Sequence, residues 1–228
     1  MNAASKWESV KIFLLQKSEE VGINHPSGLG SKYVNNPLIY IDKQKKMYDL
    51  IAPSSDSKVF EIGPGVGYFG YICESMSDND LFQYSGIDCM VDTNNERWKD
   101  GCCYYEMHNK LNLSEKIREF FISPQEKIEF RGTFDHIVAM QASFAANWKA
   151  GQSWEVMDHI FFLHDCVEHL SEQGDLFIQH NPPLLTDDIK SLYHNLSDKQ
   201  AITSGGFDSN LFFYITRNKL MEHLKTLD

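Results

Sequence analysis

The sequence has no apolar run of about eighteen residues, the length that a membrane-spanning helix requires. Its first ten residues, MNAASKWESV, also lack the apolar segment of a secretory signal peptide. These two absences argue against membrane insertion and against export. We therefore expect a cytoplasmic protein without a membrane partner.

Basic residues are scarce relative to acidic ones. The chain has 21 Lys and Arg against 32 Asp and Glu, which gives a formal net charge of −11 at pH 7. Neutralising a nucleic-acid backbone requires a basic surface. A local group, Lys43, Lys45 and Lys46, is more typical of a solvated helix face than of a phosphate-binding site. We therefore do not expect a nucleic-acid partner.

Cysteine is also sparse, and none of the five cysteines forms a CxxC pair. Reduced, buried thiols are the expected state. Adjacent Cys102 and Cys103 leave a metal or redox pair open, but neighbours on a strand point to opposite faces. The histidines at 159, 164 and 169 step by five, whereas a metal pair on a helix needs residues i and i+4. We expect no metal site.

Length and composition describe an ordinary globular chain. At 228 residues, with 42% apolar and 23% charged residues, it is long enough to bury a full core. No internal repeat or low-complexity tract is apparent. The chain is one domain by this measure.

Most of the functional information lies in KVFEIGPGVGYFG, residues 58–70. Val59, Phe60 and Ile62 predict a buried strand, and the glycines that follow predict a tight turn. Residues 68–76 then predict a helix. A strand, a glycine turn and a helix N-terminus create a concave site where backbone N–H groups face a ligand. Such a site is typical of nucleotide binding.

Two patterns overlap in this stretch. Gly65, Gly67 and Gly70 satisfy GxGxxG, the dinucleotide fingerprint. The acidic-x-GxGxG pattern is satisfied as well, by Glu61 with the glycines at 63, 65 and 67, and it resembles the first motif of the class I S-adenosylmethionine-dependent methyltransferases. The position of the glycines relative to the predicted strand favours the second pattern, because the strand then ends at Glu61 and Ile62. A passage at 169–178, HLSEQGDLFI, resembles the HLxxxGxLxI segment of the same family more loosely.

The resemblance covers residues 58–216 and implies a fold. That fold is an α/β, Rossmann-like, three-layer αβα sandwich with a mostly parallel seven-stranded sheet. Residues 1–57 would form an N-terminal helical cap, and residues 58–228 would form one compact S-adenosylmethionine-binding domain.

The sequence patterns predict the elements of this fold. Helices are expected at residues 5–22, 42–51, 68–76, 114–121, 153–170 and 217–227, and another is expected after Thr186. Strands are expected at residues 58–62, 82–88, 102–107, 134–140, 175–180, 201–204 and 211–216.

The resemblance also implies which residues bind S-adenosylmethionine. The turn would hold its aminoacyl end, Asp88 its ribose, and residues after the third and fourth strands its adenine. The predicted cofactor-binding residues are Glu61, Gly63, Pro64, Gly65, Gly67, Tyr68, Asp88, Asn109 and Gln141. Asp88 ends the second strand, at the distance where a carboxylate reaches ribose hydroxyls in both cofactor families. A turn-capping aspartate is the alternative, and His108 is a further, weaker candidate.

The sequence identifies the catalytic residue less clearly than the cofactor-binding residues. His180, at the end of the fifth predicted strand, is our first candidate for a general base, with His25 and Tyr40 behind it. HNPP at 180–183 is similar to an amino-methyltransferase motif, but it follows the fifth strand instead of the fourth and lacks the aromatic residue. A strand-ending turn is therefore the preferred interpretation.

The predicted function is transfer of a methyl group from S-adenosylmethionine to an oxygen or nitrogen atom of a small-molecule acceptor. Two alternatives remain open: an NAD-dependent oxidoreductase, and a non-catalytic S-adenosylmethionine-binding domain. The sequence does not identify the acceptor or the oligomeric state.

Overall fold

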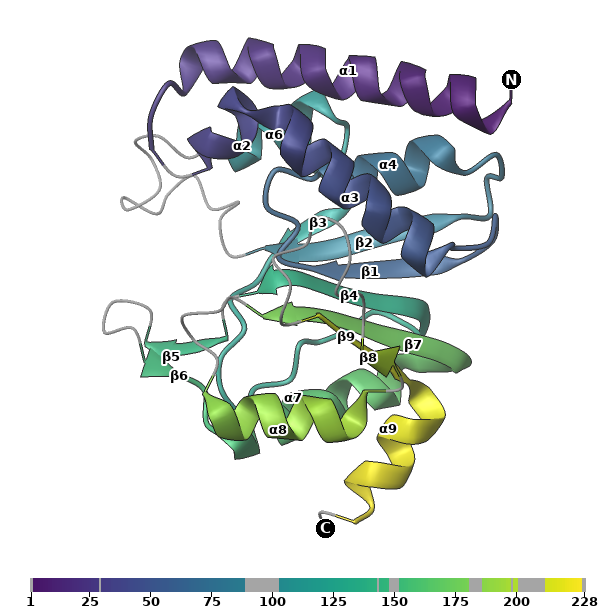
Figure 1. Ribbon diagram of the computed structural model, residues 1–228, viewed down its shortest axis with the longest axis vertical. Coiled ribbons are helices and arrows are strands. Elements are labelled where there is room, and N and C mark those ends of the chain that lie inside the picture. The colour runs from purple at the N-terminus through teal and green to yellow at the C-terminus, as the bar shows by residue number, and fades with distance from the viewer. Residues whose placement is uncertain are drawn as a thin grey trace. The chain divides into compact units, whose positions relative to one another are not determined.

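A computed structural model describes residues 2–28, 30–88, 103–142, 144–147, 152–180, 186–197, 199–200 and 212–226 (Figure 1). The chain divides into two compact units. The first unit comprises Met1–Ser57 and Pro64–Phe120, and the second comprises Lys58–Gly63 and Phe121–Asp228. Each unit is described in turn.

Helices dominate the first unit. They are α1 (Ala3–Asn24), α2 (Ser31–Asn35), α3 (Pro37–Ile51), α4 (Tyr68–Met76) and α6 (Tyr104–Lys110). The side chain of Asn2 caps α1 by accepting a hydrogen bond from the Ser5 N–H, and α1 packs against the other four described helices of the unit. Pro37 occupies the first turn of α3, where its missing N–H costs nothing.

Two parallel strands complete the first unit, β2 (Gln83–Asp88) and β3 (Ile117–Glu119). In their register Gly86 lies opposite Ile117, and Asp88 lies opposite Glu119. The N–H of Gly86 donates to Lys116 O, and the N–H of Phe120 donates to Asp88 O. These bonds extend the pairing beyond both ends of the short strand.

Two sequence predictions are wrong in this unit. Residues 102–107 were expected to form a strand, but Tyr104–Lys110 is helix α6, because Tyr104, Met107, His108 and Leu111 share the buried face of a helix. Residues 114–121 were expected to form a helix, but Ile117–Glu119 is strand β3, where pairing with β2 outweighs local propensity.

The second unit contains five strands in the order β1-β4-β7-β9-β8. They are β1 (Lys58–Ile62), β4 (Phe134–Ala142), β7 (Leu170–His180), β8 (Lys199–Gln200) and β9 (Phe212–Thr216). The first three run parallel, and β9 is antiparallel to both β7 and β8. Continuous apolar runs such as Leu176–Ile178 are buried, as expected for strands covered on both faces.

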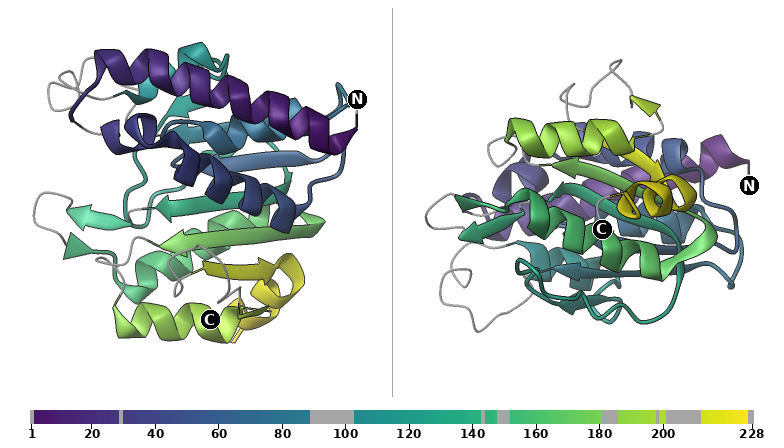
Figure 2. Two further views of the ribbon diagram at one scale, coloured as in Figure 1. Left: turned by 45° about the horizontal axis from the view of Figure 1, so that its top comes forward. Right: turned by 90° about the horizontal axis from the view of Figure 1, so that it is seen from below.

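Three helices and a small hairpin accompany these strands. They are α7 (Val156–His169), α8 (Asp187–Leu196), α9 (Arg217–Leu224), β5 (Ala145–Asn147) and β6 (Gln152–Ser153). Helix α7 begins with a capping box between Glu155 and Asp158, and the Thr186 side chain caps α8. Figure 2 shows α9 continuing directly from the end of β9.

The predicted α/β fold with a mostly parallel sheet and packed helices is confirmed. The strands expected at 58–62, 82–88, 134–140, 175–180 and 211–216 are present as β1, β2, β4, β7 and β9. The domain boundary expected between residues 57 and 58 stays a prediction, and the strand expected at 201–204 lies outside the described residues. None of the described helices is long and apolar enough to cross a bilayer.

Candidate cofactor site

The glycine turn of the first unit leads straight into helix α4. Gly65 and Gly67 have φ angles of 57° and 81°, in the left-handed region that disfavours other residues. The Gly67 N–H donates to Pro64 O over 2.9 Å, and Gly67 is the residue before the first turn of α4. A Cβ atom at Gly67 would lie 3.0 Å from Leu113 Cδ1. The turn therefore requires glycine both for its backbone and for its packing.

Asp88 lies beside this turn. It is the last residue of β2, its side chain is buried, and its Oδ2 accepts a hydrogen bond from the Gly65 N–H over 2.9 Å. The acid and the glycines were selected from separate parts of the sequence, and the fold of the first unit brings them together. The alternative role of turn capping is also realised in part, because the carboxylate bonds a turn N–H.

His108 holds the same glycine from its other side. Its Nε2 lies 2.7 Å from Gly65 O, and because a carbonyl only accepts, Nε2 carries the proton. Burial lowers the pKa of His108 to about 4, so the ring is neutral at pH 7. Its Nδ1 is a buried acceptor without a hydrogen-bond partner among the described residues. From the sequence, His108 was only a weak candidate, because it matches no diagnostic motif.

Two further predicted residues have other partners. Asn109 is exposed, and its Oδ1 accepts a hydrogen bond from the Ser114 hydroxyl. Tyr68 is fully buried, with its hydroxyl donating to Tyr33 O over 3.0 Å and lying 2.7 Å from Ser18 Oγ. The phenol of Tyr68 thus anchors the helices, and its backbone N–H remains for the turn. Both stay predictions as cofactor ligands.

The second unit contains the other predicted residues. Glu61 is buried in β1, opposite Val138 of β4, and Gly63 follows that strand. Gln141 and His180 lie at the carboxyl ends of the neighbouring parallel strands β4 and β7, where His180 pairs with Ala142. That edge is where α/β sheets bind ligands. The roles of these residues also stay predictions.

His180 is enclosed by aromatic rings of its own unit. Its ring centroid lies 4.4 Å from Tyr193, 5.2 Å from Phe144 and 5.4 Å from His159. Burial, with a contribution from His159, lowers its pKa well below the usual range. Its Nε2 and the Nε1 of Trp154 are buried without hydrogen-bond partners among the described residues. The imidazole is therefore neutral and has an uncommitted nitrogen.

The remaining candidates have structural contacts or lie outside the described part of the chain. His25 Nε2 pairs with Glu106 Oε2 over 3.0 Å, and the Tyr40 ring packs 4.5 Å from Tyr33. The motif residues Asn181, Pro182 and Pro183 are among those not described.

Comparison with solved structures finds methyltransferases of similar fold. A proposed S-adenosyl-L-methionine-dependent methyltransferase from Methanococcus maripaludis is 14% identical with a TM-score of 0.48. The match covers 78% of this chain and 84% of that protein. A SAM-dependent methyltransferase from Aquifex aeolicus is 19% identical with a TM-score of 0.40. The match covers 60% of this chain and 63% of that protein. At these identities the likeness concerns the fold alone.

TrmN from Thermus thermophilus is 16% identical with a TM-score of 0.43, and the match covers 64% of this chain but 40% of TrmN. The chain thus matches less than half the length of that protein. No family model matches the sequence, and no curated protein matches it either.

Proposed function

We propose that this chain binds S-adenosylmethionine and transfers its methyl group to an oxygen or nitrogen atom of a small molecule. The observation that best supports this proposal is the 2.9 Å hydrogen bond from the Gly65 N–H to Asp88 Oδ2. It joins the glycine turn to the acid that ends β2. A backbone turn next to a carboxylate is what a nucleoside ligand with ribose hydroxyls requires.

The residues of the turn fit such a ligand. The backbone of Gly65 and Gly67 would approach it closely, and the Asp88 carboxylate would accept hydrogen bonds from the ribose. His108 would position the turn by fixing Gly65 O. We propose the other predicted residues as further ligands: Glu61, Gly63, Pro64, the Tyr68 backbone, Asn109 and Gln141. When bound, S-adenosylmethionine supplies an electrophilic methyl group on a sulfonium.

His180 is the proposed general base. Its neutral ring has a buried Nε2 without a hydrogen-bond partner among the described residues, and this nitrogen can accept a proton from a hydroxyl or ammonium acceptor. The same burial that keeps the ring neutral makes it a weak base. Its role is therefore to receive the proton as the acceptor's new bond forms, not to ionise the acceptor beforehand.

The net charge supports a small-molecule acceptor, and the buried cysteines support a cytoplasmic location. A net charge of −11 disfavours polyanionic acceptors, which leaves small molecules as the preferred class. Cys73, Cys103 and Cys166 are buried thiols that form no disulfide, which suits a reducing compartment such as the cytoplasm.

One observation favours the second candidate, an NAD-dependent enzyme. A Cβ at Gly70 would lie 2.3 Å from Tyr84 Cζ, so Gly70 permits close packing of α4 on β2. Close helix packing is the role of the third glycine in GxGxxG. Against this, β1 ends at Ile62, which puts Gly63 and Pro64 before the first glycine of that fingerprint.

Titration calorimetry with S-adenosylhomocysteine and, separately, with NAD distinguishes the two. Saturable binding of S-adenosylhomocysteine alone is the expected result. It would justify a screen of small-molecule acceptors with S-adenosylmethionine, read by the mass increase of one methyl group. Binding of NAD alone would overturn the proposal. Binding without turnover of any acceptor would leave the non-catalytic alternative.

A further inference from the structure

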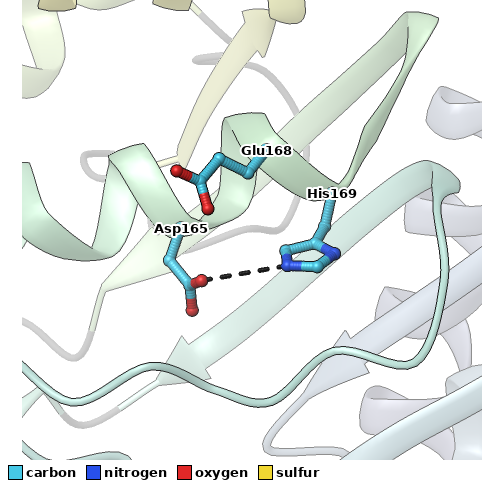
Figure 3. Close-up of side chains that lie close together, drawn as sticks. All are labelled: Asp165, Glu168 and His169. Carbon is cyan, nitrogen blue, oxygen red and sulfur yellow. Dashed lines mark ion pairs between the residues drawn. The ribbon is translucent and has the colours of Figure 1, made fainter.

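Three potential ligand atoms converge at the carboxyl end of helix α7 (Figure 3). They come from Asp165, Glu168 and His169, and all lie within 4.8 Å of one another. The residues belong to two successive turns of one helix, with Asp165 and His169 in an i, i+4 relation. Exposed acids often cluster without a ligand, so the buried member of the group decides its meaning.

Asp165 is that member. Its side chain is 2% exposed, and its Oδ2 accepts a hydrogen bond from the Ile128 N–H over 2.8 Å. Its Oδ1 is buried and has no hydrogen-bond partner among the described residues. Burying a carboxylate oxygen without a partner is costly. Oδ1 points toward the ring of His169, with 4.0 Å between it and Nε2 (Figure 3). That distance is too long for a hydrogen bond.

The orientation of His169 makes Nε2 a potential ligand. Its Nδ1 lies 3.0 Å from Gly132 O, and because the carbonyl must accept, Nδ1 carries a proton. Nε2 is the ring nitrogen that faces Asp165. Phe130 stacks on the imidazole at 4.8 Å between centroids and fixes its plane. Metal-binding histidines typically donate their other N–H to a backbone carbonyl or carboxylate in this way.

Glu168 completes the group on the solvent side. Its side chain is 57% exposed, and it pairs with the equally exposed Lys127 over 2.8 Å. An exposed lysine can be displaced by a metal ion at little cost, because surface pairs are weak.

We propose that Asp165, Glu168 and His169 bind a divalent transition-metal ion, with zinc as the expected class. One imidazole and two carboxylates are ligands that zinc takes, at about 2.0–2.2 Å from each donor atom. Neighbouring ligands in a tetrahedral site are then about 3.4 Å apart. The Asp165 and His169 atoms need to approach by roughly half an ångström, and exposed Glu168 needs only to rotate. Water would supply the fourth ligand.

The bound ion would stabilise the packing of segment 127–132 on α7. The two hydrogen bonds that orient the ligands come from Ile128 and Gly132 of this segment. The spacing of the histidines alone predicted no metal site. Asp165 and His169, a carboxylate and a histidine, supply the i, i+4 relation that the histidines lack. The proposal is independent of the methyltransferase function.

The test is calorimetric titration of the full chain, stripped of metal, with zinc chloride, together with cobalt absorption spectra. Saturable binding of one ion per chain is expected. Asp165→Asn keeps an acceptor for Ile128 while removing the charge, and His169→Ala removes the nitrogen ligand. Each should weaken zinc binding about tenfold or more. Lys127→Ala, which removes the competing cation, should tighten it.

His223→Ala on α9 is the matched control, because His223 is another partly exposed helix-end histidine outside the group. It should bind zinc like the wild type. Circular dichroism checks that each variant is folded. The proposal is overturned if the wild type binds no zinc stoichiometrically, or if folded Asp165→Asn binds it unchanged. It is also overturned if Lys127→Ala, which leaves all three ligands in place, weakens binding.

Discussion

His108 donates a hydrogen bond from Nε2 to the carbonyl oxygen of Gly65 over 2.7 Å. Asp88 accepts from the N–H of the same glycine, so the peptide groups on both sides of Gly65 are held by buried side chains. A turn fixed in this way is pre-organised, and a ligand that bound it would not have to order the backbone.

The first prediction concerns pH. His108 has a folded pKa of about 4 because of burial, below its value of 6.5 in an unfolded chain. A depressed pKa means that the unfolded state binds the proton more tightly. The contribution of His108 to stability is therefore complete above about pH 6.5 and is lost as the pH falls toward 4. The full loss is about 3 kcal/mol.

Urea unfolding at pH 7.5, 6 and 5 measures this loss. His108→Gln retains a donor for Gly65 but cannot titrate, so its stability should depend less steeply on pH than that of the wild type. His223→Gln, at a partly exposed histidine, serves as the control and should follow the wild type. An unchanged slope in His108→Gln would show that the buried histidine is not the group responsible.

Asp88→Ala tests the cofactor site independently of any acceptor. We expect S-adenosylhomocysteine binding to weaken by roughly 1–3 kcal/mol, the scale of losing hydrogen bonds to a charged group. Calorimetry gives the affinity. Asp80→Ala is the matched control, because Asp80 is an exposed acid that precedes β2. Unchanged affinity in a folded Asp88→Ala protein would remove Asp88 from the site.

The sequence predicts those parts of the fold that local signals determine. The strand at 58–62, the glycine turn and the helix at 68–76 were all predicted, because apolar residues and glycines mark their limits. Strand β3 was not, because Ile117 extends only through pairing with Gly86 of a distant strand. Helix α6 was mistaken for a strand, because aromatic residues favour strands locally while the buried face forms only in the folded unit.

The same distinction applies to the candidate site. Gly65 and Asp88 could be predicted because a short motif and a regular αβ spacing select them. The role of His108 could not, because it depends on a contact with a carbonyl group far away in the sequence. Tyr68 matches the motif by position, whereas its hydroxyl contacts Tyr33 and Ser18 of the N-terminal helices. Position in a motif does not reveal which way a side chain points.

Tyr68→Phe separates these two roles. The variant loses a buried hydroxyl that donates to Tyr33 O and contacts Ser18, so the protein should lose about 1–3 kcal/mol of unfolding free energy. Its affinity for S-adenosylhomocysteine should not change, because the backbone N–H is retained. Chemical denaturation and calorimetry measure the two quantities. Weaker binding without loss of stability would instead place the phenol in contact with the ligand.

Gly67→Ala and Gly63→Ala form a matched pair that tests the packing of the turn. Both residues have positive φ, 81° and 70°, so alanine strains either backbone by about 1–2 kcal/mol. At Gly63 a Cβ meets no atom of the described residues within 4 Å, whereas at Gly67 it lies 3.0 Å from Leu113 and 3.1 Å from His108. Gly67→Ala should therefore cost about 1–3 kcal/mol more than Gly63→Ala.

Urea unfolding at pH 7.5 compares the two variants directly. The added cost at Gly67 arises because its Cβ presses on the histidine that holds Gly65. In Gly67→Ala that histidine must shift, so the hydrogen bond to Gly65 O weakens and S-adenosylhomocysteine should bind less tightly as well. Equal losses of stability at the two glycines would show that backbone strain alone requires them, and that His108 does not brace the turn.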